Sequence, residues 1–166
     1  AGDSQNSTPL SLLASRLSSG PEVKALAERL CAGATTPRER LRRIAEFTRG
    51  EIRYVAIELG IGGYQPHPAV EVLKNRYGDC KDKVCLLVSL LGAAGIRAEP
   101  ALIRTASEGE LDTALVDLSQ FNHAIALVHL DDGPLWVDPT AASCGLDYLP
   151  GTDQATYALV VSPGHG

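Results

Sequence analysis

The sequence predicts a single α+β domain, and two observations lead to this prediction. Helix-type apolar spacing and helix caps dominate the chain up to about residue 95, whereas runs rich in strand-forming residues dominate the rest. Helices followed by antiparallel strands are typical of α+β domains. A chain of 166 residues is also long enough to bury one substantial core. Within this domain we assign residues 1–50 to an N-terminal helical segment and residues 51–166 to the core.

Two helices are predicted before residue 51. The first begins with Pro21 at its first position and runs to about Cys31. The second follows Thr36, whose spacing to Glu39 is that of a capping box, and Gly50 is expected to end it. Helical spacing predicts that its buried face comprises Leu41, Ile44, Ala45 and Thr48.

The middle of the chain leads into an apolar helix. Residues 51–57 are rich in strand formers, and residues 60–68 form a loop with three glycines and two prolines. A short helix is predicted from Pro68 to about residues 77–78. The central helix is predicted from residue 79 or 80 to Gly95. Because it is apolar on nearly all sides, we expect neighbouring elements to bury it on several sides.

The second half of the chain is predicted to form strands separated by a long polar loop at residues 107–120. The predicted strands are residues 96–105, interrupted by Pro100, then 123–130, 134–140 and 157–162. The second and third of these form a hairpin. A turn at Asp132–Gly133 would set Asp138 four residues out of register with His123. A longer loop near residues 130–131, or a bulge near Trp136, would be needed to set the two opposite each other.

Composition excludes several classes of partner. The formal net charge is −5 and no tract of Lys and Arg is present, so nucleic acid and anionic membranes are poor partners. The longest apolar run, residues 84–91, is too short to span a bilayer. No cysteine pair has the CxxC spacing of a zinc site, and we expect neither a metal nor a cofactor. Because the chain lacks methionine, we expect it to be part of a larger protein.

Two cysteines of the central helix lie in different predicted environments. With Asp79 as N-cap, Cys80 takes the first helical position, where the helix dipole and free backbone N–H groups favour a thiolate. Cys85 lies more than a turn further along, among Leu and Val, where a thiol stays neutral. Cys80 therefore suits a nucleophile and Cys85 suits packing. The alternative is that Cys80 is merely a small residue at a helix start.

A thiol nucleophile needs a base, and the base needs a group that orients it. Among the four histidines, His123 opens a predicted strand directly after the polar loop. Asp138 closes the partner strand, next to Pro139. The hairpin could bring these two side chains together while the central helix presents Cys80 to the imidazole.

Three segments of the chain resemble the motifs of the transglutaminase-like superfamily. "YGDCKDKVCLLVSLLGAAGIRAEPALI" resembles its cysteine motif, "FNHAIALV" its histidine segment and "LWVDPTA" its aspartate segment, in the same order along the chain. The resemblance covers residues 52–149 and is strongest to a bacterial branch in which this core follows a β-rich domain. Three motifs in the right order are far more specific than any one of them.

The resemblance implies a papain-like α+β core, with a cysteine-bearing helix packed on an antiparallel sheet. By that match Cys80 is the nucleophile, His123 the general base and acid, and Asp138 the orienting residue. The implied reaction is acyl transfer from peptide bonds or glutamine amides of a peptide or protein substrate, through a thioester. The resemblance also favours a periplasmic or extracellular location.

Two points depart from the family or stay open. Transglutaminases proper use an upstream tryptophan as oxyanion donor, but here the single tryptophan is Trp136 on the aspartate strand. That departure favours hydrolysis over crosslinking and leaves Gln65, in the loop before the motif, as a candidate second donor beside the Cys80 backbone N–H. Asn122 could instead help to hold the imidazole.

Two other classes of function compete with the enzyme. The first is a non-catalytic peptide-binding module on the same fold, although such modules typically lack a residue of the triad. The second is a metal site at Cys80 and His123, which would need further ligands from Cys31, His67 or Cys144.

Overall fold

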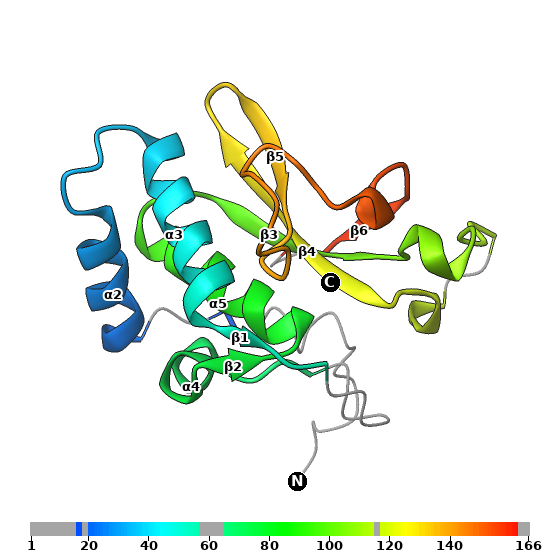
Figure 1. The fold of residues 1–166 in the computed structure, drawn as a ribbon, viewed down its shortest axis with the longest axis horizontal. Coiled ribbons are helices and arrows are strands. Elements are labelled where there is room, and N and C mark those ends of the chain that lie inside the picture. Colours follow the sequence, from blue (N-terminus) through cyan, green and yellow to red (C-terminus); the bar gives the residue numbers. More distant parts are fainter. Residues whose placement is uncertain (1–15, 18–19, 57–64, 115–116, 163–166) are drawn as a thin grey trace, which may run out of the picture.

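The structure, a computed structural model, describes residues 16–17, 20–56, 65–114 and 117–162. Within these ranges helices pack on one face of a four-stranded antiparallel sheet, so the α+β prediction is confirmed (Figure 1). The helices are α2 (Pro21–Cys31), α3 (Pro37–Glu51), α4 (Ala69–Asn75) and α5 (Cys80–Ala93). The strands of the sheet are β3 (Ala98–Ile103), β4 (His123–Leu130), β5 (Gly133–Val137) and β6 (Ala158–Val160).

The sheet has the strand order β5-β4-β3-β6, which makes β3 and β4 its central strands. Pro100 lies inside β3 without interrupting its pairing with β4, where it stands opposite Ala126. The Pro100 carbonyl accepts from Val161 N at 2.8 Å, so the backbone edge of this residue faces the end of β6. Because N–H and C=O of one strand residue point to the same neighbour, the missing N–H costs no bond to β4.

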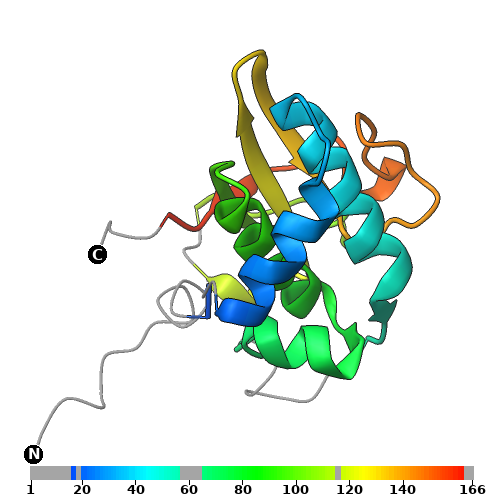
Figure 2. The same cartoon turned by 90° about the vertical axis from the view of Figure 1, so that its left-hand side faces the viewer.

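Helix α5 is the centre of the helical layer. It contacts α2, α3 and α4 as well as β3 and β4, and Figure 2 shows α2 and α3 in front of it, on the side away from the sheet. Eleven of its fourteen residues are buried, which confirms the prediction of an apolar helix enclosed on several sides. No helix in the described ranges is long and apolar enough to cross a membrane.

The opposite face of the sheet is covered by the chain that follows β5. A second, smaller apolar cluster lies there, and the short helical turn η4 (Gly151–Asp153) belongs to the covering segment. The cluster consists of Ala101, Ile103 and Ile125, packed with Trp136, Leu149 and Val160. The sheet is therefore buried on both faces near its centre.

Helix α2 has the bounds that the sequence predicts, and α3 differs from the prediction in its capping contacts and at its end. Thr36 caps α3 by accepting from Glu39 N at 3.1 Å, and the four residues expected on its inner face are buried. The Glu39 carboxylate, however, accepts from Thr35 N and not from Thr36 N, so the capping box is displaced by one residue. Gly50 does not end the helix, because its backbone stays helical and α3 continues to Glu51.

The region expected to be a strand and a loop differs more. Of residues 51–57, just Arg53–Tyr54 form a strand, β1, which pairs in parallel with β2 (Tyr77–Gly78). Helix α4 ends earlier than predicted because Arg76 takes a left-handed conformation with φ 61°, and the next two residues join β1. Residue 57 of the predicted strand and residues 60–64 of the predicted loop lie outside the described residues.

The β4–β5 hairpin turns at Asp131 and Asp132. Leu130 pairs with Gly133, and pairing continues along β5 without a bulge. The turn is thus one residue earlier than the Asp132–Gly133 turn considered from the sequence. The Asp-Asp-Gly run is compatible with a two-residue turn at Asp131–Asp132 or at Asp132–Gly133. The packing of the two strands decides which of these turns forms.

This register makes His123 and Asp138 diagonal neighbours. Val137, the last residue of β5, pairs with Ala126, so Asp138 follows opposite Ile125. Ile125 and His123 point to the same face of β4 because side chains alternate along a strand. Diagonal neighbours on one face lie within reach of longer side chains. Neither the longer loop nor the bulge expected from the sequence is needed.

The start of α5 is fixed by two aspartates. Asp79 accepts from Asp82 N at 3.0 Å, and the Asp82 carboxylate accepts from Asp79 N at 3.2 Å. Asp82 also accepts from His67 N at 2.7 Å, which ties the preceding loop to the helix. A Cβ at Gly78 would lie 2.5 Å from Asp82 Cβ, so this approach requires glycine.

Substitution of Gly78 by alanine should therefore destabilise the helix start. We expect Gly78→Ala to lower the free energy of unfolding by about 1–3 kcal/mol, because Asp82 must move and its hydrogen bonds are strained. Gly92→Ala is the matched control: nothing lies within 4 Å of its added Cβ, and alanine favours the helix by about 0.5–1 kcal/mol. Urea unfolding measures both, and equal stability of the two variants would contradict the proposed clash.

Lys83 is a buried cation one turn into α5. It is 1% exposed, and its ammonium donates to Ile52 O at 2.6 Å, at the carboxyl end of α3. Burial lowers the pKa of Lys83 to about 8, although the charge of Asp138 opposes this shift. Lys83 thus satisfies carbonyl groups that the end of α3 leaves free.

The lowered pKa of Lys83 predicts a dependence of stability on pH. Between about pH 8 and the pKa of about 10.4 in the unfolded chain, the unfolded state binds more protons, so stability rises with pH. Relative to Lys83→Met, the protein should gain about 1–3 kcal/mol over this interval in urea unfolding. Lys74→Met, which replaces an exposed lysine, should follow the unsubstituted protein. A difference between Lys83→Met and the unsubstituted protein that stays constant with pH would contradict the assignment.

Candidate active site

The fold brings Cys80, His123 and Asp138 together from three separate segments. His123 Nε2 lies 3.2 Å from Asp138 Oδ2, and Cys80 is close enough to His123 to raise the pKa of its imidazole. Cys80 is 9% exposed, the His123 side chain 11% and Asp138 2%. The three residues that the sequence nominated as a group therefore meet at one largely buried point, where α5 begins, β4 begins and β5 ends.

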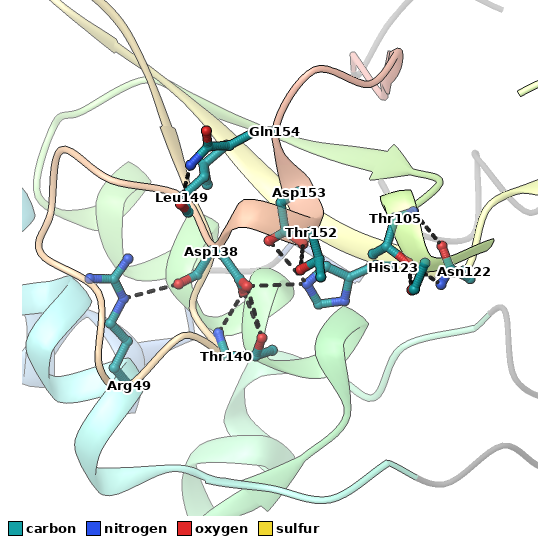
Figure 3. A network of polar contacts seen from close by, with 11 residues as sticks. Arg49, Thr105, Asn122, His123, Asp138, Thr140, Leu149, Thr152, Asp153 and Gln154 are labelled. Atoms are coloured by element: carbon teal, nitrogen blue, oxygen red, sulfur yellow. Dashed lines mark hydrogen bonds and ion pairs between the residues drawn. The ribbon is translucent and has the colours of Figure 1, made fainter. Parts of the chain in front are cut away.

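Asp138 is held from several directions (Figure 3). Its carboxylate accepts from Thr140 N at 2.7 Å and from Thr140 Oγ1 at 2.8 and 3.0 Å. Its backbone carbonyl accepts from Arg49 Nε at 3.0 Å. The same guanidinium donates to the carbonyls of Cys144 and Gly145, so α3 clamps the loop after β5. These contacts fix the carboxylate that orients the imidazole.

The electrostatics of the pair favour charged forms of both groups. Burial by itself lowers the pKa of His123, but hydrogen bonds and charges from Asp138 and Cys80 outweigh it and raise the pKa to about 10. Burial raises the pKa of Asp138, whereas hydrogen bonds from His123 and Thr140 lower it, and the net shift is downward. An imidazolium facing a carboxylate is the result near neutral pH.

A second carboxylate, Asp153 in η4, was not identified from the sequence. Its Oδ2 lies 3.9 Å from His123 Nε2, and Figure 3 shows it beside Asp138 and Thr152. Asp153 comes from a short irregular segment with no periodicity or motif around it. No local sequence signal would have pointed to it, because its position depends on how the segment after β5 folds over the sheet.

The metal site considered from the sequence contained Cys80 and His123, and the structure places a different set of potential ligands around His123. Within the described residues, the group of potential ligands is His123, Asp138 and Asp153, whose ligand atoms lie within 4.8 Å of one another. Cys31 and Cys144 do not belong to this group. Since Asp138 already accepts hydrogen bonds from Thr140 and His123, a cation here would have to displace them.

Gln65 and Asn122, the two further candidates, have other contacts. Gln65 is exposed. When its amide is oriented so that the oxygen faces the Arg16 guanidinium, this oxygen accepts from Arg16 Nε at 3.2 Å. Asn122 holds the loop after β3, because its Oδ1 accepts from Thr105 N and its Nδ2 donates to Thr105 Oγ1, both at 2.8 Å.

Cys85 behaves as a packing residue. It is 1% exposed, and its thiol donates to Arg16 O at 3.1 Å. Burial raises the pKa of Cys85 to about 12. A thiol in this state is unreactive at neutral pH, which agrees with the contrast between the two helix cysteines that the sequence predicts.

Comparisons with known proteins identify the family and the fold. A model of the transglutaminase-like superfamily matches residues 24–139, more than half of the chain, whereas no curated protein matches it. A candidate protease from Parabacteroides distasonis superposes with a TM-score of 0.66 and 25% identity, over 78% of this chain and 25% of the other. A candidate cysteine protease from Cytophaga hutchinsonii superposes with a TM-score of 0.57 and 16% identity, over 77% of this chain and 42% of the other.

A third solved structure is the periplasmic domain of TgpA from Pseudomonas aeruginosa, with a TM-score of 0.50 and 20% identity, over 79% of this chain and 47% of the other. The chain thus spans between a quarter and half of these proteins. Their likeness extends to the α+β, papain-like core with its cysteine-bearing helix and antiparallel sheet. The chain belongs to the transglutaminase-like superfamily, a family of thiol-dependent enzymes.

Proposed function

We propose that the chain is a thiol-dependent acyl-transfer enzyme that cleaves amide bonds of peptide or protein substrates. Cys80 is the nucleophile, His123 the general base and acid, and Asp138 the orienting residue. The observation that carries the proposal is the position of the His123 imidazole, which lies 3.2 Å from the buried Asp138 carboxylate and close enough to Cys80 for that residue to raise its pKa. Nucleophilic catalysis requires a nucleophile next to a base, and a further group that orients the base.

The reaction runs in two half-reactions. His123 already holds the proton as an imidazolium, and the Cys80 sulfur attacks the carbonyl carbon of the amide as a thiolate. As the C–N bond breaks, the imidazolium returns the proton to the departing amine, which leaves an acyl thioester on Cys80. His123 then takes a proton from water or an acceptor amine, whose attack on the thioester releases the acyl product and restores the Cys80 thiolate beside the imidazolium. With Nε2 directed at Asp138, Nδ1 is the nitrogen left for the sulfur.

The tetrahedral intermediates need donors for their oxyanion. The backbone N–H of Cys80 is one of those at a helix start that have no partner within the helix, so it can serve as the first donor. Gln65 remains our candidate for the second. In its favour, the loop that carries it is tied to the start of α5 through His67 and Asp82. We favour hydrolysis over crosslinking because the single tryptophan, Trp136, lies on β5 and does not precede the cysteine.

Cys80 should be the most reactive of the four thiols. At mildly acidic pH we expect iodoacetamide to label it first, because burial raises the pKa of Cys31 and, to about 12, that of Cys85. Cys80→Ala should lose at least about 10³-fold in amide turnover, whereas Cys31→Ala should keep full turnover. Peptide mapping locates the label. Faster labelling of Cys31 or Cys144 would contradict the nucleophile assignment, and a labelled Cys80 with no turnover would favour the non-catalytic module.

Asp138→Asn should uncouple the imidazole. The amide removes the charge that holds the pKa of His123 near 10, so NMR titration of the histidine should give a lower value. Turnover should fall at least about tenfold. The His123 pKa of about 10 lies above the unfolded value of about 6.5, so its stabilisation is complete below pH 6.5 and disappears as pH rises toward 10.

The unfolding free energy of the unsubstituted protein should therefore decline more steeply than that of Asp138→Asn over this interval. Asp131→Asn, at the exposed hairpin turn, is the control for removal of an aspartate charge. An unchanged His123 titration in Asp138→Asn would leave a Cys80–His123 dyad as the remaining assignment.

A further inference from the structure

Asp153 and Asp138 lie side by side, but their surroundings differ. Asp138 accepts from His123 Nε2, Thr140 N and Thr140 Oγ1. Asp153 is 5% exposed, and its Oδ1 accepts from Thr152 Oγ1 at 3.0 Å. Its Oδ2 is buried and has no hydrogen-bond partner among the described residues. A bare carboxylate oxygen at this depth costs far more free energy than a protonated one.

The nearest basic group does not remove this cost. His123 Nε2 is 3.9 Å from Asp153 Oδ2, which is too long for a hydrogen bond, and it lies closer to Asp138 at 3.2 Å. Lys83 and Arg49, the other cations of this region, act on Asp138 from α5 and α3. Asp153 also lines a partly open pocket of about 460 Å³, whose wall combines apolar side chains such as Ile125 and Trp136 with polar ones such as Thr156.

We propose that Asp153 is a neutral carboxylic acid whose proton is shared with Asp138, and that it is a positioning residue for His123. The two carboxylates have oxygens within 4.8 Å of each other, so a proton on one of them relieves their mutual repulsion. Burial raises the pKa of Asp153, and the charge of Asp138 raises it further, although the charge of His123 opposes them. This inference rests on the proposed function only for its catalytic consequence.

The consequence concerns how strongly His123 holds its proton. With Asp153 neutral, one negative charge stands behind the imidazole, whose pKa is already about 10. A second charge 3.9 Å from Nε2 would stabilise the imidazolium further and slow return of the proton to the departing amine. The O–H of Asp153 also gives Asp138 one more donor and restrains its orientation toward His123.

Infrared spectroscopy in D₂O tests the protonation state directly. At neutral pH the unsubstituted protein and the exposed control Asp131→Asn should show the C=O stretch of a buried carboxylic acid, and Asp153→Asn should lack it. The absence of this band from the unsubstituted protein, or its persistence in Asp153→Asn, would overturn the inference. Should Asp153→Asn fail to fold, ¹³C-labelled aspartate in the unsubstituted protein must show a protonated carboxyl resonance at neutral pH, and its absence would overturn the inference equally.

Thermal unfolding gives a second readout with a sign. If native Asp153 keeps its proton above the unfolded pKa of about 3.9, the unsubstituted protein loses stability with rising pH relative to Asp153→Asn. The Tm difference, Asp153→Asn minus unsubstituted, should therefore increase with pH above about 4. An ionised Asp153 paired with His123 would make the same difference fall as pH rises toward about 4 and stay constant above it, which would overturn the inference.

Turnover then separates the positioning role from the reaction itself. Asp153→Ala removes the donor to Asp138 and should lower kcat by about tenfold with KM little changed, and Asp153→Asn, which keeps an N–H donor, should recover most of that loss. Equal losses in both variants would overturn the positioning role. Turnover absent from every form, with the carboxylic-acid band present, would refute the proposed function and leave the shared proton established.

Discussion

The hydrogen bond between His123 and Asp138 joins two groups that burial alone would neutralise. At 2% exposure, an isolated Asp138 would keep its proton, and an isolated imidazole at His123 would lose its own. Each partner reverses the effect of burial on the other, and Thr140 supplies the remaining donors to the carboxylate. Burial strengthens the attraction between the imidazolium and the carboxylate, and this attraction keeps both groups charged.

Helices α3 and α5 supply two further cations near the Asp138 carboxylate. Lys83 lies three residues after Cys80 on α5, and its ammonium binds the end of α3, whose Arg49 in turn binds the loop that follows Asp138. Two of the helices that form the core thus also carry the cations around the carboxylate, the buried Lys83 and the half-buried Arg49. Movement of either helix would change the core packing and the electrostatics of the site together, so stability and chemistry are coupled.

Local chemistry made part of this predictable. The start of α5 at Cys80 follows from an aspartate cap and a long apolar run, both visible in the sequence. The hairpin was predicted, but its turn at residues 131–132 depends on packing that an Asp-Asp-Gly run does not specify. The burial of Lys83 was missed because lysine is normally exposed and its partners are carbonyls distant in sequence. Asp153 was missed for a similar reason, since the fold of the covering segment alone brings it to His123.

The segment after β5 explains why two aspartates in one pocket have different protonation states. Thr140, two residues after Asp138, directs its N–H and hydroxyl at that carboxylate. Asp153 reaches the same pocket at the end of the segment, where Thr152 supplies one donor and no N–H or O–H of the described residues reaches the other carboxylate oxygen. Donors stabilise one carboxylate as an anion, and their scarcity keeps the other neutral, which separates the pKa values of two chemically identical groups. Because both environments are built by the same stretch of chain, the folding of that stretch over the sheet sets the charge behind His123.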